Sequence, residues 1–221
     1  MKSFIFSFIS LWTWLLTFTS GFANVISLLL LDGASSHHTG NISKMAIAIW
    51  EKDMETIIFM LFLVGSFFLG SILSGILFHE QKLRPQKRYG VLLISLGFFL
   101  LFTSFFFSEK VVLFAISFLS GAQNAMFLYI KHYLARTSHL TGYLTDTGFA
   151  LGRVLRGYKE DWQKFYFNFF QILVFLLGGL LAHLSIDLWA KNAVFLVSIL
   201  YVLAGIIYFT VRRKSLFQHR K

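Results

Sequence analysis

Six stretches of about 20 mostly apolar residues follow one another along this chain, and they constrain its fold more than any other feature. A helix of that length crosses the hydrocarbon core of a bilayer, which is about 30 Å thick. The stretches cover approximately residues 11–31, 57–78, 89–107, 111–130, 165–185 and 193–211. The sequence therefore predicts an all-α integral membrane protein with six transmembrane helices.

The composition agrees with a membrane protein. Hydrophobic residues make up 57% of the 221 residues and charged residues only 14%, whereas a soluble domain has about 25% charged residues. This balance excludes a soluble globular domain and a disordered chain. A cleaved signal peptide ending near Ala23 is the competing interpretation of the N-terminus, but the apolar run continues to Leu31. The chain has no cysteine, so disulfides, thiolate nucleophiles and iron–sulfur clusters are excluded, and we expect no cofactor.

The basic residues are distributed unevenly over the predicted loops. Sixteen Lys and Arg residues fall on one side of the six spans and four on the other. Basic loops stay in the cytoplasm, so we expect both termini there and a multi-pass location in the cytoplasmic membrane. The net charge of +10 does not indicate nucleic acid, because the basic residues flank apolar stretches. The lipid bilayer is the expected partner of these residues, and no nucleic acid is expected.

The chain contains an internal repeat. Phe-x-Ser-Gly-x-x-Asn at residues 18–24 recurs at 118–124, and Ser-His-x-Thr-Gly at 36–40 recurs at 138–142. A weaker Phe-x-Leu-Gly match links 67–70 with 175–178. One membrane domain over 1–221 would then hold repeat 1 at about 1–108 and repeat 2 at about 109–221. Because each repeat has three spans, an odd number, the two would have inverted topology.

Each half also contains a short amphipathic segment. After each Thr-Gly pair the apolar residues recur at helical spacing, for example Ile42, Met45 and Ile49 in the first half and Leu144, Leu151 and Leu155 in the second. We expect a short surface or re-entrant helix in each half, between its first and second spans.

These motifs resemble the YoaK-like family of bacterial inner-membrane proteins, whose function is not established, over essentially the whole chain. The matching elements are the segment from Gly21 to Asn24, the segment Thr39-Gly40-Asn41, the segment from Gly121 to Ala125, and Thr141-Gly142. The resemblance implies a membrane protein suspected of transport and supplies no substrate. Relatives often carry Asp where this chain has Asn24, and an amide cannot titrate, so no proton-carrying role follows for this position.

Polar amides inside the predicted spans are the first candidate site residues. Asn24, Gln123 and Asn124 must find hydrogen-bond partners, because an unmet polar group in lipid costs several kcal/mol. One interpretation is structural, with the amides joining helices across the two halves. The other is that they line a substrate site at the repeat interface.

The two Thr-Gly elements are the second candidate. Thr39, Gly40 and Asn41, and likewise Thr141 and Gly142, precede helices, so the Thr hydroxyls could cap them. Alternatively, the helix starts could bind a substrate group. His37, His139 and Asp146 lie next to these elements, where they could gate or move a proton, or could be ordinary interfacial side chains. No ligand spacing indicates a metal site.

Glycines at the repeated positions predict close helix packing. These are Gly21, Gly121, Gly70 and Gly178.

No enzyme motif is present, so we do not expect an enzyme. The leading functional hypothesis is a small secondary transporter or exporter of an unidentified small molecule or ion, working by alternating access. The alternative is a non-transporting membrane scaffold, assembly or lipid-interacting protein. Either interpretation is compatible with a homo-oligomer.

Overall fold

The computed structural model describes residues 8–31, 33–78, 86–126, 128–130 and 133–218. Within them the chain is almost entirely helical. The helices are α1 (Phe8–Leu30), α2 (His38–Glu51), α3 (Met54–Leu77), α4 (Lys87–Phe106), α5 (Glu109–Asn124), α6 (Leu140–Leu155), α7 (Trp162–Trp189) and α8 (Ala193–Gln218). Short 3₁₀ turns, Lys159–Asp161 and Ala190–Asn192, precede α7 and α8, and β1 (Leu128–Ile130) pairs with β2 (Tyr133–Ala135) in an antiparallel hairpin.

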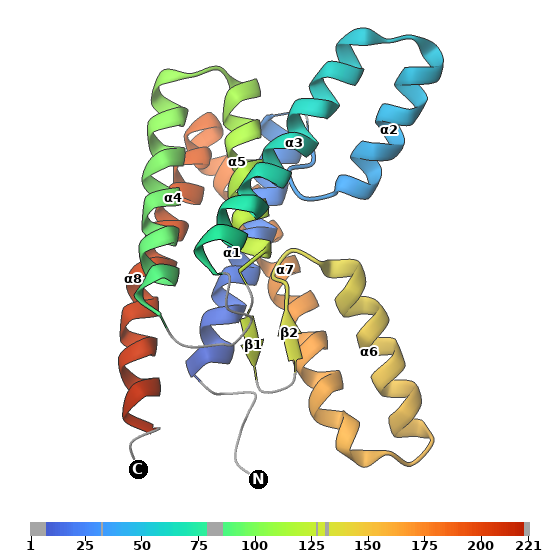
Figure 1. Ribbon diagram of the computed structural model, residues 1–221, viewed down its shortest axis with the longest axis vertical. Helices are drawn as coiled ribbons and strands as arrows, with labels where there is room; N and C mark the ends of the chain where they lie inside the picture. The colour runs from blue at the N-terminus through green and yellow to red at the C-terminus, as the bar shows by residue number, and fades with distance from the viewer. Residues whose placement is uncertain (1–7, 32, 79–85, 127, 131–132, 219–221) are drawn as a thin grey trace.

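The long helices pack in three main pairs: α1 against α7, α3 against α5, and α4 against α8. Figure 1 shows α4 and α8 side by side at one edge and α1 and α5 in the middle. The hairpins α2–α3 and α6–α7 project on the opposite edge, one above the other. The start of α1 and the end of α8 lie at the same end of the molecule.

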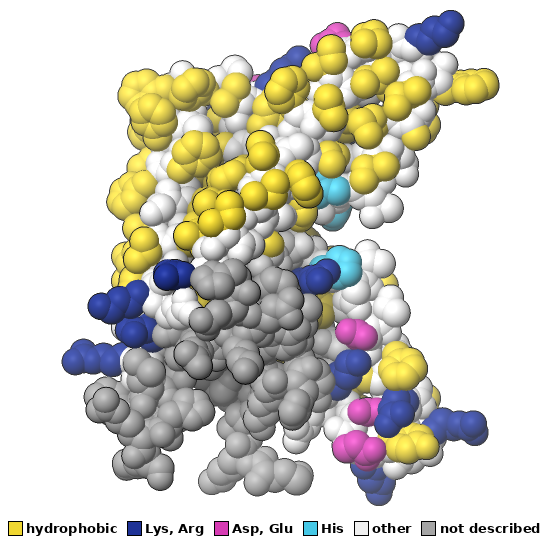
Figure 2. All heavy atoms as spheres, in the orientation of Figure 1, with side chains coloured by type: hydrophobic (Ala, Val, Ile, Leu, Met, Phe, Trp, Pro, Cys, Tyr) yellow, Lys and Arg dark blue, Asp and Glu magenta, His cyan; other side chains and the backbone are white. Residues whose placement is uncertain are grey.

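Several helices have the length and apolarity of membrane spans. Among the described residues, four helical segments are long and apolar enough to cross a membrane: Ser10–Leu30, Met54–Leu77, Lys87–Phe106 and Lys159–Thr210, the last of which contains α7 and most of α8. Large apolar side chains cover their outer faces; Phe68 is 64% exposed and Phe105 is 66% exposed (Figure 2). Water-soluble proteins do not expose apolar surface of this extent. These features indicate an integral membrane protein.

α1 is the central helix. Leu16 and Ile26 are fully buried, together with small hydroxyl residues such as Thr13 and Ser27. Near its start, the Trp12 indole Nε1 donates to the Ala204 carbonyl oxygen at 3.0 Å. Small and hydroxyl side chains let helices approach closely in a membrane, which explains why an unusually polar helix lies in the middle.

The turns of the two hairpins follow from local sequence. α2 ends at Lys52, which has a left-handed backbone (φ 60°), and α3 begins immediately after Asp53. The Asp53 carboxylate accepts a hydrogen bond from the Thr56 N–H at 3.2 Å and so caps α3. After α6, Gly157 has φ +102°, a conformation that favours glycine, and the chain turns into α7.

One sequence prediction is wrong, and part of the basis for another lies outside the described residues. The fourth apolar stretch was expected to be helical through residue 130, which is wrong: α5 ends at Asn124, and residues 128–130 form a strand. The Asn124 side chain ties this point to the chain before α6, so the backbone turns although its residues stay apolar. Some cations used to predict orientation, including Lys2, Lys82 and Arg84, lie outside the described residues.

Candidate functional site

Asn24 and Asn124 make matching hydrogen bonds to the segments that lead into α2 and α6. The Asn24 Oδ1 accepts from the Ser36 hydroxyl at 3.0 Å, and the Asn124 Oδ1 accepts from the Ser138 backbone N–H at 3.2 Å. The two amides are 100 positions apart in the sequence and the two serines 102. Each amide thus holds the start of the short helix in its own half.

Gln123 joins three parts of the chain at the centre of the molecule. Its side-chain Nε2 lies 3.0 Å from the Leu16 carbonyl oxygen, 2.9 Å from the Ser20 hydroxyl and 2.6 Å from the Thr137 hydroxyl, and these three acceptors share its two N–H groups. The residue is only 1% exposed. α5, α1 and the segment before α6 therefore share one buried amide.

The short helices α2 and α6 start in the same way. Their N-cap residues are His37 (φ −96°, ψ 59°) and His139 (φ −88°, ψ 64°), and neither N-cap side chain accepts a hydrogen bond from the helix. Thr39 and Thr141 lie inside the first turn, so the prediction that their hydroxyls cap these helices is wrong. Each helix start keeps backbone N–H groups without an intrahelical partner.

In Figure 1 these two helix starts are both seen at mid-height, on the same edge of the molecule. α2 and α6 run away from this region in opposite directions, so their N-terminal ends point toward the same place (Figure 1). The space-filling view shows a notch between the two hairpins with histidine side chains on both walls (Figure 2). His37, Thr39, Gly40, His139 and Thr141 are exposed.

The remaining candidates of the first turns are more enclosed. Asn41 is buried, and its Nδ2 donates to the Ala34 carbonyl oxygen at 2.9 Å, which closes the turn before α2. Gly142 lies under the His139 ring: a Cβ at this position would be 2.6 Å from the His139 Nδ1. Both residues shape the helix starts from within.

His38 faces the body of the protein rather than the notch. Its ring centroid lies 4.1 Å from that of Phe67 on α3, and its Nδ1 is 3.5 Å from the Asn41 Nδ2. Burial lowers the pKa of the His38 imidazole to about 4, against an ordinary value of 6.5. The ring is therefore neutral at physiological pH and packs as an aromatic group.

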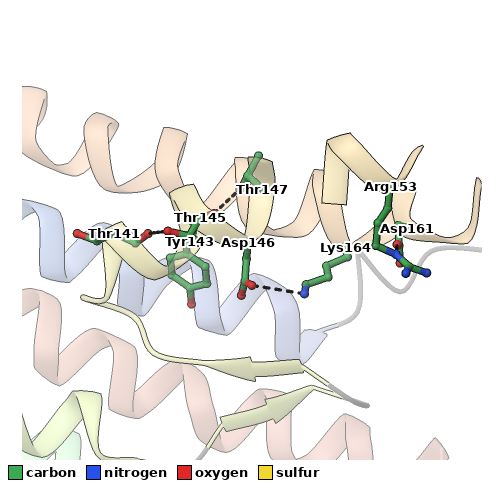
Figure 3. Close-up of polar contacts among 8 residues, drawn as sticks. All are labelled: Thr141, Tyr143, Thr145, Asp146, Thr147, Arg153, Asp161 and Lys164. Atoms are coloured by element: carbon green, nitrogen blue, oxygen red, sulfur yellow. Dashed lines mark hydrogen bonds and ion pairs between the residues drawn. The ribbon is translucent and has the colours of Figure 1, made fainter. Parts of the chain in front are cut away.

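Asp146 lies in the second turn of α6 and faces α7 (Figure 3). Its carboxylate pairs with the Lys164 ammonium at 3.4 Å. Further along, Arg153 pairs with Asp161 and Glu160 and lies over the Tyr158 ring. Asp146 is thus not at the notch and acts in the contact between α6 and α7.

The four repeated glycines lie at helix crossings. A Cβ at Gly21 would overlap the Phe175 carbonyl oxygen, and one at Gly178 would overlap the Phe18 carbonyl oxygen. Between α3 and α5, Gly70 and Gly121 face the carbonyl oxygens of Phe118 and Phe67 in the same manner. Only glycine allows the backbones to come this close.

Two polar contacts that the sequence reasoning missed lie at the same crossings. The Thr17 hydroxyl donates to the Gln171 Oε1 at 2.5 Å between α1 and α7, and the Ser117 hydroxyl donates to the Leu63 carbonyl oxygen at 2.8 Å between α5 and α3. Thr17 and Ser117 are 100 positions apart, and Leu63 and Gln171 are 108 apart. The repeat offsets were the signal that could have found these contacts.

The site holds no obvious metal centre. Among the described residues, no group of three or more His, Asp or Glu side chains could hold a metal ion. What the site offers is neutral: amides, hydroxyls and backbone N–H groups around the two helix starts. These groups can donate and accept hydrogen bonds.

No curated protein and no solved structure matches the chain. A family model does match, over residues 12–207, and its description is a protein of unknown function, DUF1275. The match covers α1 through most of α8 and agrees with the resemblance to the YoaK-like family. By its length and coverage, this match shows that the chain belongs to the DUF1275 family.

Proposed function

We propose that this protein is a small secondary transporter in which a polar solute binds between the starts of α2 and α6 and reaches the two sides of the membrane alternately. The observation that carries the proposal is the pair of uncapped helix starts, each held by an amide, on the two walls of one notch (Figures 1 and 2). Broken or re-entrant helices that meet near the midplane are typical of solute sites in secondary transporters.

The proposed topology is six spans in two inverted repeats. Matching contacts support it: Gly21 and Gly121, on α1 and α5, meet the carbonyl oxygens of Phe175 and Phe67. In the α4–α8 pair, Gly97 and Gly205 are 108 positions apart, the offset that also separates Phe67 from Phe175. A Cβ at Gly97 would be 2.8 Å from the Ser198 carbonyl oxygen, and one at Gly205 would be 2.7 Å from that of Gly90. α5 has 16 residues, about 24 Å of helix, and would be the shortest span.

The orientation rests on charge. The Arg and Lys residues at the end that contains the start of α4, the end of α8 and the α6–α7 turn would face the cytoplasm, which also places both termini there. The turn between α2 and α3 carries Glu51, Asp53 and Glu55 and would face outward. We propose the bacterial cytoplasmic membrane as the location.

Asn124 and the exposed residues in the first turns of α2 and α6 would contact the solute, whereas Asn24 and Gln123, which are 3% and 1% exposed, would hold these segments in place. Free backbone N–H groups at a helix start favour a solute that presents hydrogen-bond acceptors. His37 and His139, the exposed N-cap residues of α2 and α6, would sense or gate passage, whereas Asp146 is paired with Lys164.

The test begins with purified protein and a library of metabolites, drugs, lipids and ions, read by thermal stabilisation in proportion to ligand affinity. Compounds that stabilise the protein are then followed into proteoliposomes. The double variant Asn24→Ala/Asn124→Ala should remain folded and lose uptake, while Gly65→Ala, which touches nothing within 4 Å, should retain it. Uptake that persists in the double variant would exclude this site.

A scaffold or assembly role is the second candidate. Gly65 and Gly75 on α3 have no neighbour within 4 Å in the described structure, so another helix, including one from a second copy, could pack closely there. Stable co-purification with one membrane partner, loss of that partner in Gly65→Leu, and no response to any compound would favour this role over transport.

A further inference from the structure

The two short helices are held to the protein unequally. The lead-in to α6 is fixed by Gln123, whose Nε2 reaches the Thr137 hydroxyl at 2.6 Å while also bonding to Leu16 and Ser20 of α1. One side chain thereby connects the start of α6 to two other helices. We call this set of hydrogen bonds the Gln123 tether.

The first half has hydroxyl residues at the positions that correspond to Ser20 and Thr137, but it has no amide at the position that corresponds to Gln123. At the repeat offsets of 100 and 102, Ser20 corresponds to Ser120, Thr137 to Ser35, and Gln123 to Ala23. The Ser35 hydroxyl is fully buried and has no hydrogen-bond partner among the residues that the structure describes. The lead-in to α2 therefore keeps its contact from Ser36 to Asn24 and lacks the counterpart of the tether.

A second asymmetry lies further along the hairpins. Asp146 of α6 pairs with Lys164 of α7, and Arg153 of α6 pairs with Asp161 just before α7. In the part of the chain that the structure describes, no ion pair joins α2 to α3; Glu55 of α3 pairs instead with Lys110 of α5. α6 is thus secured at both its start and its flank.

We propose that α2 and its lead-in are the moving gate of this protein and that α6 is the fixed wall of the site, held there by the Gln123 tether. Calling α2 a gate rests on the proposed transport function; the difference in mobility does not. In this arrangement Gln123 is a positioning residue for α6. Because Ala23 has no amide, the lead-in to α2 is linked to the α1 side chains by the Asn24–Ser36 bond and has no counterpart of the tether.

Hydrogen exchange of the full-length protein in lipid nanodiscs tests this directly. Amides of residues 41–48 in α2 should exchange about threefold to tenfold faster than those of 143–150 in α6, the factor expected for one buried hydrogen bond. Gln123→Leu should speed exchange in α6 by a similar factor. Residues 92–100 in α4, which pack on α8, report global destabilisation and should not change.

Matched substitutions at Ser35 and Thr137 make the test independent of any one variant. Thr137→Val removes a bonded hydroxyl and should speed α6 exchange, whereas Ser35→Ala removes an unbonded one and should leave α2 exchange unchanged. Ala23→Gln adds the missing amide; where it folds, it should slow α2. Because Ala23 is only 1% exposed, the Ser35 and Thr137 pair serves if this variant does not fold.

Equal exchange in α2 and α6, or an α6 that Gln123→Leu and Thr137→Val do not affect, would overturn the proposal. A confirmed difference in a protein that transports none of the tested compounds would retain the tether and reject the transport function. Solute uptake together with equal hydrogen exchange in α2 and α6 would support the transport function and reject the difference in mobility.

Discussion

The backbone of α1 at Gly21 lies directly against the carbonyl oxygen of Phe175 on α7, with no room for a side chain between them. The same contact recurs between Gly121 on α5 and Phe67 on α3. The first contact joins α1 of the first half to α7 of the second half. The other joins α5 of the second half to α3 of the first half. The two halves are therefore interlocked through backbone contacts at glycine.

Substitution at these glycines should destabilise the protein severely. Gly21→Ala and Gly121→Ala each place a Cβ on a carbonyl oxygen of a rigid helix, which should cost about 1–3 kcal/mol or more. The apparent melting temperature in detergent measures the loss. The control is Gly65→Ala on α3: the added Cβ has no neighbouring atom within 4 Å, so this variant should not lower the melting temperature. Equal melting of all three variants would contradict the close approach.

The paired hydroxyl contacts should contribute modestly and similarly. Thr17→Val removes the bond to Gln171, and Ser117→Ala removes the bond to the Leu63 carbonyl oxygen. Each should lower the free energy of unfolding by about 1 kcal/mol, as interhelical hydrogen bonds in membranes do. Ser43→Ala, whose hydroxyl bonds only within α2, is the matched control and should change it by a few tenths at most. A much larger effect at one crossing only would reveal unequal halves.

Stability should fall in acid because of His38. Its folded pKa is about 4 and its ordinary value 6.5, so the unfolded chain binds this proton more readily. The contribution of the neutral ring is complete above pH 6.5 and is lost as the pH falls toward 4. Because the ring is partly exposed, we expect a loss of about 1–2 kcal/mol over this interval.

His38→Phe keeps an aromatic ring against Phe67 and removes the titrating nitrogen. The difference between the melting curves of this variant and the native protein should grow between pH 6.5 and 4. If the two proteins respond to pH identically, His38 is not the group that titrates.

The ion pair between Asp146 and Lys164 should matter little for stability. The two side chains are 54% and 27% exposed, and pairs of this kind contribute about 0–1 kcal/mol. Asp146→Asn should therefore unfold within about 1 kcal/mol of the native protein, and the exchanged pair Asp146→Lys/Lys164→Asp should recover the difference. A Tm that collapses in Asp146→Asn would mean that the carboxylate has a second partner.

Hydropathy predicted most of the long helices because a membrane-spanning helix is one continuous run of apolar residues, which can be recognised without knowing its partners. It failed at the end of α5, where Met126 and the strand that follows are apolar but leave the helix. The turn there depends on a bond from Ser138 to Asn124, and a partner 14 positions away leaves no local pattern. The prediction that Thr39 and Thr141 cap α2 and α6 was wrong because both helices begin earlier, directly after His37 and His139.

The repeat motifs identified residues that the structure places at helix crossings and helix starts. They did not predict which helix each would touch, because periodicity defines a face and not its partner. The contact of Gly21 with α7, rather than with a helix of its own half, is a property of the whole fold. Gln123 could be recognised as buried, but its three acceptors come from segments that only the folded chain brings together.

The packing of α1 against α7 also sets an order of assembly. After α1 ends at Leu30, another 159 residues are synthesised before α7 ends at Trp189, so α1 enters the bilayer long before its main partner. The first half cannot mature alone, since its remaining long-helix contacts lie with α5 and α8. The small polar side chains Thr13, Thr17 and Ser20 of α1, which are buried in the folded protein, therefore reach their final packing only after the second half is inserted.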